Sequence, residues 1–204
     1  MSKQRGEHLL QGKYNTKKRA ASFYNNQMID YLNSVMQDFI CKQEMVFIST
    51  SDSDGHCDSS FRAGMEGFIR VIDESTLLYP EYRGNGIMAS LGNIVENPHI
   101  GLMFIDFIED SIGLHVNGQA SILDNEQLNT LMLSEEILED IEREGDKPER
   151  WVVINVDEAY IHCSKHIPKF YKREKDIEWG TDDERQKGGD YFKVKQKGND
   201  RPFT

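Results

Sequence analysis

The spacing of apolar residues changes near residue 44, and this change divides the sequence into a helical start and a β-rich middle. Six apolar residues before it recur at the spacing of a helix that buries one face: Ile29, Leu32, Val35, Met36, Phe39 and Ile40. The pattern predicts a core-facing helix. We expect it to be capped by Asn25 or Asn26 and to follow a shorter helix from Thr16 to Tyr24.

From Glu44 onward the pattern predicts short strands separated by turn residues. The apolar or alternating runs are 45–50, 57–63, 67–72, 76–79, 100–107, 113–123 and 151–156, the last leading to 159–163. Turn sequences at 51–55 and 73–75 join the first four runs into two hairpins. The run 100–107 is almost entirely apolar, which predicts a central strand covered on both faces.

Two more helices are predicted among these strands. One follows a loop containing Gly84 and Gly86 and ends near Asn97, because Pro98 cannot continue a helix. The other spans 128–141, where apolar residues recur among acidic residues that form a solvated face.

The expected fold class is α+β, mostly β: an antiparallel split β-barrel of about six strands with peripheral helices. We expect residues 1–43 to be a helical segment that packs on the barrel, and 44–168 to be the barrel domain. Residues 169–204 are charged and poor in aliphatic side chains, so they cannot form a core alone. We expect the aromatic residues of this C-terminal arm, Trp179, Tyr191 and Phe192, to pack against another surface, such as that of a partner subunit.

Composition narrows the class of protein. The net charge of -11 argues against nucleic acid or an anionic membrane surface as a partner. Three cysteines without a Cys-x-x-Cys pair favour a reducing compartment over disulfides. The start of the chain is polar, unlike a signal peptide, and no apolar run approaches the roughly 20 residues of a membrane helix. We therefore expect a soluble cytoplasmic protein.

The segment 79–93 carries the clearest candidate chemistry. A short glycine loop followed by a helix that bears Ser90 brings backbone N–H groups to an anion. Arg62, in a strand beside Ser59 and Ser60, has the guanidinium that binds phosphate in a bidentate manner. Two plainer interpretations remain open. Arg62 can pair with Glu66 or Glu81, and the glycines can be turn residues alone.

Five segments in order resemble the pyridoxamine 5'-phosphate oxidase-like family of FMN-binding split barrels. They are Phe47-Ile-Ser-Thr-x-Asp-x-x-Gly55, Ser59-Ser-Phe-Arg62, Gly84-Asn-Gly-Ile-Met-Ala-Ser-Leu-Gly-Asn93, Asn97-Pro-His-Ile-Gly-Leu-Met-Phe-Ile-Asp106 and Leu114-His-Val-Asn-Gly118. The resemblance covers 44–123 and, more loosely, 151–165. It implies a homodimer with two FMN molecules in clefts between the barrels.

The resemblance also implies which residues bind the cofactor. They are Ser60, Arg62, Tyr79, Pro80, Arg83, Gly84, Asn85, Ser90, Asn93, His115, Asn117 and Lys165. The oxidase proper has basic side chains near the helix start, where this chain has Ile87, Met88 and Ala89. This departure shifts phosphate binding onto backbone N–H groups, Ser90 and Arg62, and it removes the basis for assigning the oxidase's own substrate.

The chemistry implied is electron transfer by the flavin, which needs position and hydrogen bonds rather than a catalytic triad. No catalytic residue is assigned. The implied electron partner is NAD(P)H or dioxygen, and the substrate is an unknown small molecule. The sequence has no dinucleotide fingerprint, so a nicotinamide would bind transiently over the flavin. The alternatives are a non-catalytic flavin reservoir or sensor, and a haem-binding split barrel with His115, His162 or His166 as axial ligand.

Three features of the sequence keep two interpretations each. His162 and His166 have a metal-like spacing but lack an accompanying acid, so we expect no metal; His166 and Lys165 can line the cofactor cleft instead. His115 can face the cofactor or be an ordinary wall residue of the barrel. Trp179 can stack near the flavin of a partner subunit or simply anchor the arm.

Overall fold

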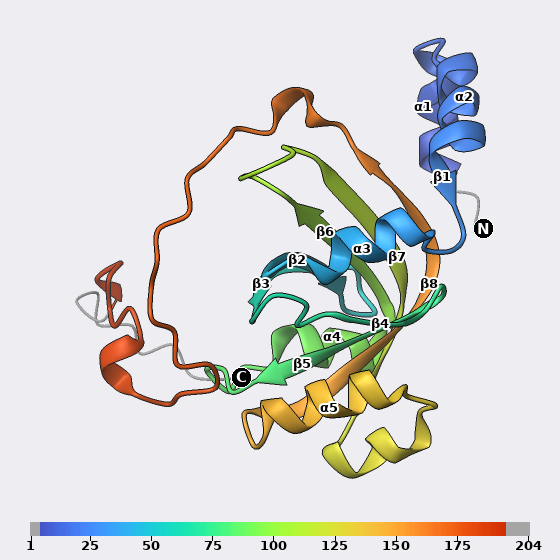
Figure 1. The fold of residues 1–204 in the computed structure, drawn as a ribbon. Coiled ribbons are helices and arrows are strands. Elements are labelled where there is room, and N and C mark those ends of the chain that lie inside the picture. Colours follow the sequence, from blue (N-terminus) through green and yellow to red (C-terminus); the bar gives the residue numbers. More distant parts are fainter. Residues whose placement is uncertain (1–4, 195–204) are drawn as a thin grey trace.

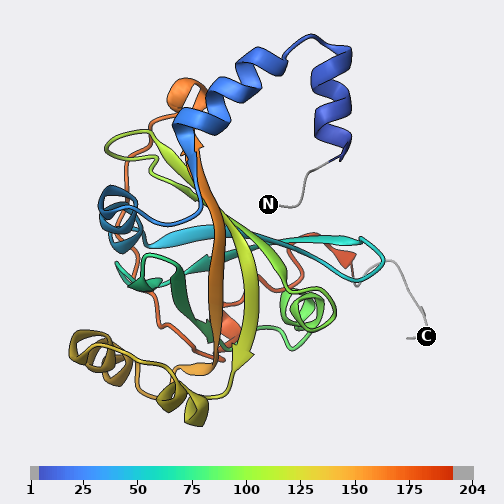
Figure 2. The same ribbon diagram turned by 90° about the vertical axis from the view of Figure 1, so that its right-hand side faces the viewer.

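One twisted antiparallel sheet forms the body of the computed structural model, which describes residues 5–194 (Figure 1, Figure 2). Its strands are β1 Met28–Ile29, β2 Met45–Ser51, β3 Cys57–Ala63, β4 Arg70–Asp73, β5 Thr76–Tyr82, β6 His99–Ile105, β7 Gly113–Leu123 and β8 Pro148–His162. Their order across the sheet is β3-β2-β6-β7-β8-β5-β4, and β1 pairs with β8. The predicted α+β class, with a mostly antiparallel sheet and outer helices, is confirmed.

The long strand β8 organises the sheet because residues 148–155 pair with β5 on one side and residues 151–162 pair with β7 on the other. A bulge interrupts the β7–β8 register between Asn117 and Gly118. A Cβ atom at Gly118 would lie 2.1 Å from the backbone oxygen of Asn155, so only glycine fits this close approach. The bulge therefore depends on one residue type at position 118.

The main core lies between the inner face of the sheet and the helices that cover it. Its largest fully buried members are Tyr79, Phe68, Phe104, Leu32, Ile40, Ile48, Ile69, Leu77, Leu102 and Ile154. Helix α4 (Ala89–Glu96) packs against β2, β3 and β7, and α3 (Ser34–Cys41) packs against β4. Burial of this apolar surface is the chief stabilising contribution, at about 25 cal/mol per Å².

A second, smaller core forms around Trp151, Leu78 and Val153 on the other side of the sheet. The 3-10 helix η1 (Asn125–Thr130) and helix α5 (Glu135–Glu144) provide the residues that cover it. Arg70 enters this region as a buried cation, 5.1 Å above the Trp151 ring, and forms a 2.8 Å ion pair with Glu144.

The first two helices, α1 (Arg5–Lys13) and α2 (Lys17–Gln27), project from the sheet instead of covering it (Figure 1, Figure 2). No residue of α2, all of which the structure describes, is buried. The β1–β8 pairing and the Phe23–Tyr160 ring contact attach this hairpin to the sheet.

The predicted single helix through Ile29 to Ile40 is wrong. Helix α2 runs to Gln27, the chain then forms β1, and α3 starts anew after Asn33, whose Oδ1 accepts a hydrogen bond from the Met36 N–H at 3.0 Å. Ile29 pairs with Ala159 in the sheet. The helical spacing of apolar residues therefore runs through a short strand, an irregular segment and a helix. Leu32 and Ile40 belong to the core, whereas Val35 is exposed.

Three other predicted elements differ in extent. The predicted helix 128–141 is two elements, η1 and α5, because the Ser134 hydroxyl accepts a hydrogen bond from the Ile137 N–H and starts a new helix. The last two strand runs form the single strand β8. Strand β6 buries alternate residues, so within this chain one face is covered and the prediction of two covered faces is wrong.

After β8 the C-terminal arm leaves the sheet as an extended chain with two short 3-10 helices, η2 (Ser164–His166) and η3 (Glu184–Gln186). Phe170 stacks on Phe107 at 5.1 Å, and the arm later returns to the sheet near β5, as the orange to red trace of Figure 1 shows. The division at 1–43, 44–168 and 169–204 stays a prediction, and residues 1–4 and 195–204 lie outside the described residues.

Candidate functional site

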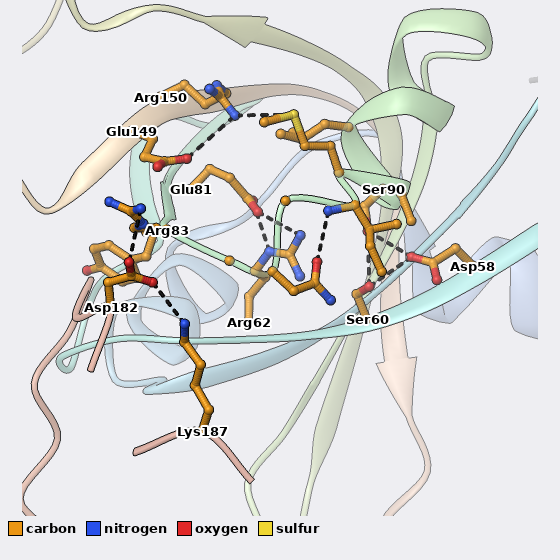
Figure 3. A pocket seen from close by; sticks show the side chains of 18 residues that line it. Asp58, Ser60, Arg62, Glu81, Arg83, Ser90, Glu149, Arg150, Asp182 and Lys187 are labelled. Carbon is orange, nitrogen blue, oxygen red and sulfur yellow. Dashed lines mark hydrogen bonds and ion pairs between the residues drawn. The ribbon is translucent and has the colours of Figure 1, made fainter. Parts of the chain in front are cut away.

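A cavity of about 650 Å³ opens where β3, β5 and the start of α4 meet (Figure 3). It is polar and contains four basic and four acidic side chains. The bases are Arg62, Arg83, Arg150 and Lys187, and the acids are Asp58, Glu81, Glu149 and Asp182. The formal charges of these eight residues cancel, so any selectivity for an anion has to come from their arrangement.

Arg62 lies in the floor of this cavity and is held by a carboxylate of β5. Its Nε donates to Glu81 Oε2 at 2.9 Å, and its Nη2 lies 2.9 Å from Glu81 Oε1. Both side chains are mostly buried, with 20% and 13% exposed. Of the two partners considered from the sequence, the structure has Glu81. The planar fork of Arg62 already has the bidentate geometry that a phosphate also uses.

A second carboxylate, Asp58, accepts hydrogen bonds from the hydroxyl groups of Ser60 and Ser90. Ser60 Oγ and Ser90 Oγ each lie 2.8 Å from Asp58 Oδ2, and they lie 3.0 Å from each other. The sequence argument missed Asp58. Alternation on β3 was the available signal, because residues 58, 60 and 62 share one face of the strand.

The loop before α4 has an unusual backbone. Met88 sits at the N-cap with a left-handed conformation, φ 55°, and Gly86 has φ 81°. Asn85 Oδ1 accepts a hydrogen bond from the Ile87 N–H at 3.0 Å, which fixes the turn. The helix then starts with Ala89, Ser90 and Leu91 against the cavity, so the positive end of the helix dipole faces this space.

The C-terminal arm completes one wall of the cavity. Trp179 stacks on Tyr82 at 6.0 Å with an interplanar angle of 28°. Arg83 Nη2 lies 3.0 Å from Asp182 Oδ2, and Lys187 Nζ lies 2.9 Å from Asp182 Oδ1. The sequence argument did not find Asp182 or Lys187, and Trp179 anchors the arm within its own chain.

The structure brings half of the predicted cofactor residues together. Ser60, Arg62, Arg83, Gly84, Asn85 and Ser90 all line the cavity. The other six also lie in the described part of the chain but are not among its lining residues: Tyr79, Pro80, Asn93, His115, Asn117 and Lys165. Their contacts with a cofactor stay predictions.

Of these six, Asn93 and Asn117 have side-chain hydrogen-bond partners, whereas the hydroxyl of Tyr79 has none among residues 5–194. Tyr79 is fully buried, which raises the pKa of its hydroxyl. Asn93 Nδ2 donates to Thr50 Oγ1 at 3.0 Å, and Asn117 Nδ2 donates to Glu158 Oε1 at 2.9 Å. Asn117 lines a separate hollow of about 850 Å³ over β2, β3, β6, β7 and β8.

His115 belongs to a small imidazole cluster at the far end of β7 and β8. Its Nε2 lies 2.8 Å from His162 Nδ1, and its ring stacks on Tyr160 at 4.7 Å. Burial, and then the neighbouring His162, lower the pKa of His115 below its usual value. Among residues 5–194, His, Cys, Asp and Glu side chains form no group of three that resembles a metal site.

The family match follows from the sequence of this barrel. A sequence model of the family described as pyridoxamine 5'-phosphate oxidase matches residues 32–163, which include α3 and β2 to β8. The chain belongs to this family. The resemblance stated from the five segments is thus confirmed, and with it the split-barrel fold class.

Solved structures of similar shape include three from bacteria. HupZ of Group A Streptococcus is 22% identical, with a TM-score of 0.46 over 63% of this chain and 92% of that chain. An FMN-binding protein from Syntrophomonas wolfei is 14% identical, with a TM-score of 0.44 over 61% and 82%. HutZ, the haem storage protein from Vibrio cholerae, is 14% identical, with a TM-score of 0.42 over 64% and 94%.

A search of curated proteins finds no match. The assignment to the pyridoxamine 5'-phosphate oxidase family rests on the sequence match together with the antiparallel sheet that the matched residues form. No helix among residues 5–194 is long and apolar enough to span a membrane.

Proposed function

We propose that this member of the pyridoxamine 5'-phosphate oxidase family is an FMN-binding flavoprotein and that the cavity beside α4 holds the FMN phosphate. The observation that carries the proposal is the convergence of Arg62, Ser60 and Ser90 on the space at the start of α4. A guanidinium fork, hydroxyl donors and a helix N-terminus are the groups that bind a phosphate dianion.

The donor set fits a phosphate group, although two carboxylates of the chain itself now use the same donors. Glu81 accepts a hydrogen bond from the guanidinium of Arg62, and Asp58 accepts hydrogen bonds from the hydroxyl groups of Ser60 and Ser90. A phosphate therefore binds by replacing these carboxylate contacts, in a cavity whose lining has no net formal charge. We expect moderate affinity for this reason, with the rest of the binding energy coming from the ring system.

The residues of the chain bind and orient the cofactor. Arg62, Ser60 and Ser90 hold the phosphate, and the backbone of the Gly84–Gly86 loop leaves room for the chain that joins it to the ring. FMN, when bound, supplies the electron or hydride transfer. We propose that the protein is a cytoplasmic homodimer and an oxidoreductase for a small molecule, with NAD(P)H or dioxygen as the electron partner.

The absorbance spectrum of the purified protein tests the cofactor. Flavin bands, or their appearance with saturable binding of added FMN, support the proposal. A protein that stays colourless and ignores FMN overturns it. Anaerobic titration with NADH and NADPH then tests turnover, because tight FMN that neither nicotinamide reduces favours a flavin reservoir or sensor.

Haem binding is the second candidate, and the His115–His162 pair favours it. The two imidazoles are joined at 2.8 Å, and the His115 ring stacks on Tyr160, so one ring nitrogen of each histidine is left for an axial ligand. The lowered pKa of His115 keeps that ring neutral at neutral pH, as metal ligation requires. A Soret band on addition of haemin that is lost in His115→Ala and His162→Ala supports haem; no such band excludes it.

A further inference from the structure

The C-terminal arm docks on a rigid part of the cavity wall. Trp179 stacks on Tyr82, and the hydroxyl of Tyr82 donates to Glu144 Oε2 at 2.9 Å. Glu144 is itself buried in its ion pair with Arg70. The backbone of Gly180 approaches the Lys147 oxygen so closely that a Cβ atom would lie 3.1 Å from it. The arm therefore meets a surface whose side chains are already fixed by buried contacts.

Beyond this anchor the arm places two charges inside the cavity. Asp182 bridges Arg83 at 3.0 Å and Lys187 at 2.9 Å, as Figure 3 shows. Both Asp182 and Lys187 line the cavity, although about 100 residues separate them from Arg83. Hydrogen bonding from Lys187, and then the charge of Arg83, lower the pKa of Asp182, so this carboxyl stays ionised between the two cations.

We propose that the arm is part of the binding site: Lys187 contacts the phosphate, and Asp182 is the carboxylate that the phosphate displaces from Arg83 and Lys187. This inference rests on the proposed FMN function. It explains how the site gains cations although Ile87, Met88 and Ala89 stand at the start of α4. Asp182 holds both cations in place, and Glu184 is a second partner of Lys187 at 2.9 Å, until an anion with more negative charge takes over the contacts of Asp182.

The test compares FMN affinities of three single variants. Lys187→Ala removes a cation from the phosphate and should weaken FMN binding by about fivefold. Asp182→Asn removes the carboxylate shared by Arg83 and Lys187, while Glu184 still pairs with Lys187, and should tighten FMN binding by about two- to fivefold. Arg185→Ala is the matched control, because Arg185 pairs with Asp183 on the same arm, is 89% exposed and is not among the described lining residues. Its affinity should equal that of the wild type.

The opposite signs separate ligand contact from anchoring. If Asp182 and Lys187 only held the arm in place, both variants would weaken FMN binding, and that result overturns the proposal. Riboflavin, which lacks the phosphate, is the second ligand, and its affinity should be the same in all four proteins. An equal loss of riboflavin and FMN in Lys187→Ala also overturns the phosphate contact.

Docking of the arm has a readout that needs no ligand. Trp179 emission, taken as the difference from Trp179→Phe, should resist iodide quenching in the wild type; full quenching overturns the docked arm. Wild-type protein that binds FMN, with Lys187→Ala unchanged, removes this inference and leaves the proposed function. If the arm is docked but the wild-type protein binds neither FMN nor riboflavin, the proposed function is wrong. The proposed phosphate contact of Lys187 is then wrong as well.

Discussion

Arg62 meets Glu81 through two contacts of 2.9 Å, and a phosphate that binds Arg62 must take the place of that carboxylate. The guanidinium is mostly buried, so water cannot replace the hydrogen bonds that it loses when Glu81 moves away. The contribution of Arg62 to phosphate affinity is therefore a difference: the interaction energy of its guanidinium with the phosphate dianion minus that with the Glu81 carboxylate.

Arg62→Ala should weaken FMN binding by about 1.5–3 kcal/mol, the usual worth of a hydrogen bond to a charged group. Equilibrium titration followed by flavin fluorescence measures the change. Arg143→Ala is the control, because Arg143 is an exposed residue of α5 that pairs with Asp140. Unchanged FMN affinity in Arg62→Ala would show that another group holds the phosphate.

Asp58→Asn should have the opposite effect. The amide oxygen still accepts the hydroxyls of Ser60 and Ser90, while the negative charge that opposes a phosphate is gone. We expect tighter FMN binding by about 1 kcal/mol in the same titration. Asp54→Asn, in the exposed turn between β2 and β3, is the control, and weaker binding by Asp58→Asn would contradict the competition between carboxylate and phosphate.

At the scale of elements, the junction between β4, β5 and α5 is held by one buried ion pair. Glu144 accepts from Arg70 at 2.8 Å and from the Tyr82 hydroxyl at 2.9 Å. Arg70 also donates to the Phe68 backbone oxygen and lies over Trp151. The pair thus connects α5 to the sheet below the second core.

Glu144→Ala should destabilise the protein by about 3 kcal/mol or more, because it leaves Arg70 buried without its counter-charge. Urea denaturation measures the free energy of unfolding. Arg143→Ala, one position earlier in α5, removes only an exposed pair and should change that energy by less than about 0.5 kcal/mol. Equal effects of the two substitutions would show that the buried ion pair contributes no more to the free energy of unfolding than the exposed one.

Two glycines make a second contrast between elements. Gly118→Ala should destabilise the protein by about 2 kcal/mol or more, because the new Cβ atom would meet Asn155 backbone at 2.1 Å. Gly92→Ala, in α4, meets no atom of residues 5–194 within 4 Å and should stabilise the protein by about 0.5–1 kcal/mol. Thermal unfolding of the two variants should move the midpoint in opposite directions.

The sequence predicted elements well where turn chemistry marked their ends. The strand 113–123 and the helix ended by Pro98 agree with β7 and α4. It failed at Ile29, because this residue lies in a two-residue strand paired with β8 although its spacing from the apolar residues of α3 is helical. The Asn33 cap was readable as a helix start, but the uninterrupted stripe of apolar residues outweighed it.

The sequence predicted the part of the site that lies in short continuous segments or in the motifs of the family. Ser60 and Arg62 share one face of β3, so their spacing links them, and the family resemblance joined them to Ser90 in α4. Asp182 and Lys187 reach the cavity from the far end of the chain, and the path of an arm without a regular period has no signature in sequence.

For the molecule as a whole, acidification should weaken the fold through His115. Its pKa is lowered in the folded protein, first by burial and then by His162, whereas the unfolded chain has the ordinary value of about 6.5. The unfolded state then binds more protons below that pH. This contribution to stability is present above pH 6.5 and is lost as the pH falls through the window just below it.

Urea denaturation at pH 7.5 and pH 5.5 checks this sign. His115→Gln keeps a polar partner for His162 without a titrating ring, so the variant should lose less stability on acidification than the wild type. A matched substitution at His99, an exposed histidine, should leave the wild-type pH dependence in place. An identical loss in wild type and His115→Gln would contradict the assignment.

The position of β8 in the sheet also decides when this protein can fold during its synthesis. Within the described sheet, β8 joins the β3-β2-β6-β7 half to the β5-β4 half. Until residue 162 has left the ribosome, β5 and β7 each therefore expose an edge of unpaired backbone N–H and C=O groups, which can pair with other chains. Stop codons before residue 148 should yield insoluble fragments, whereas an interruption within the arm should yield a barrel that is folded but has an incomplete cavity wall.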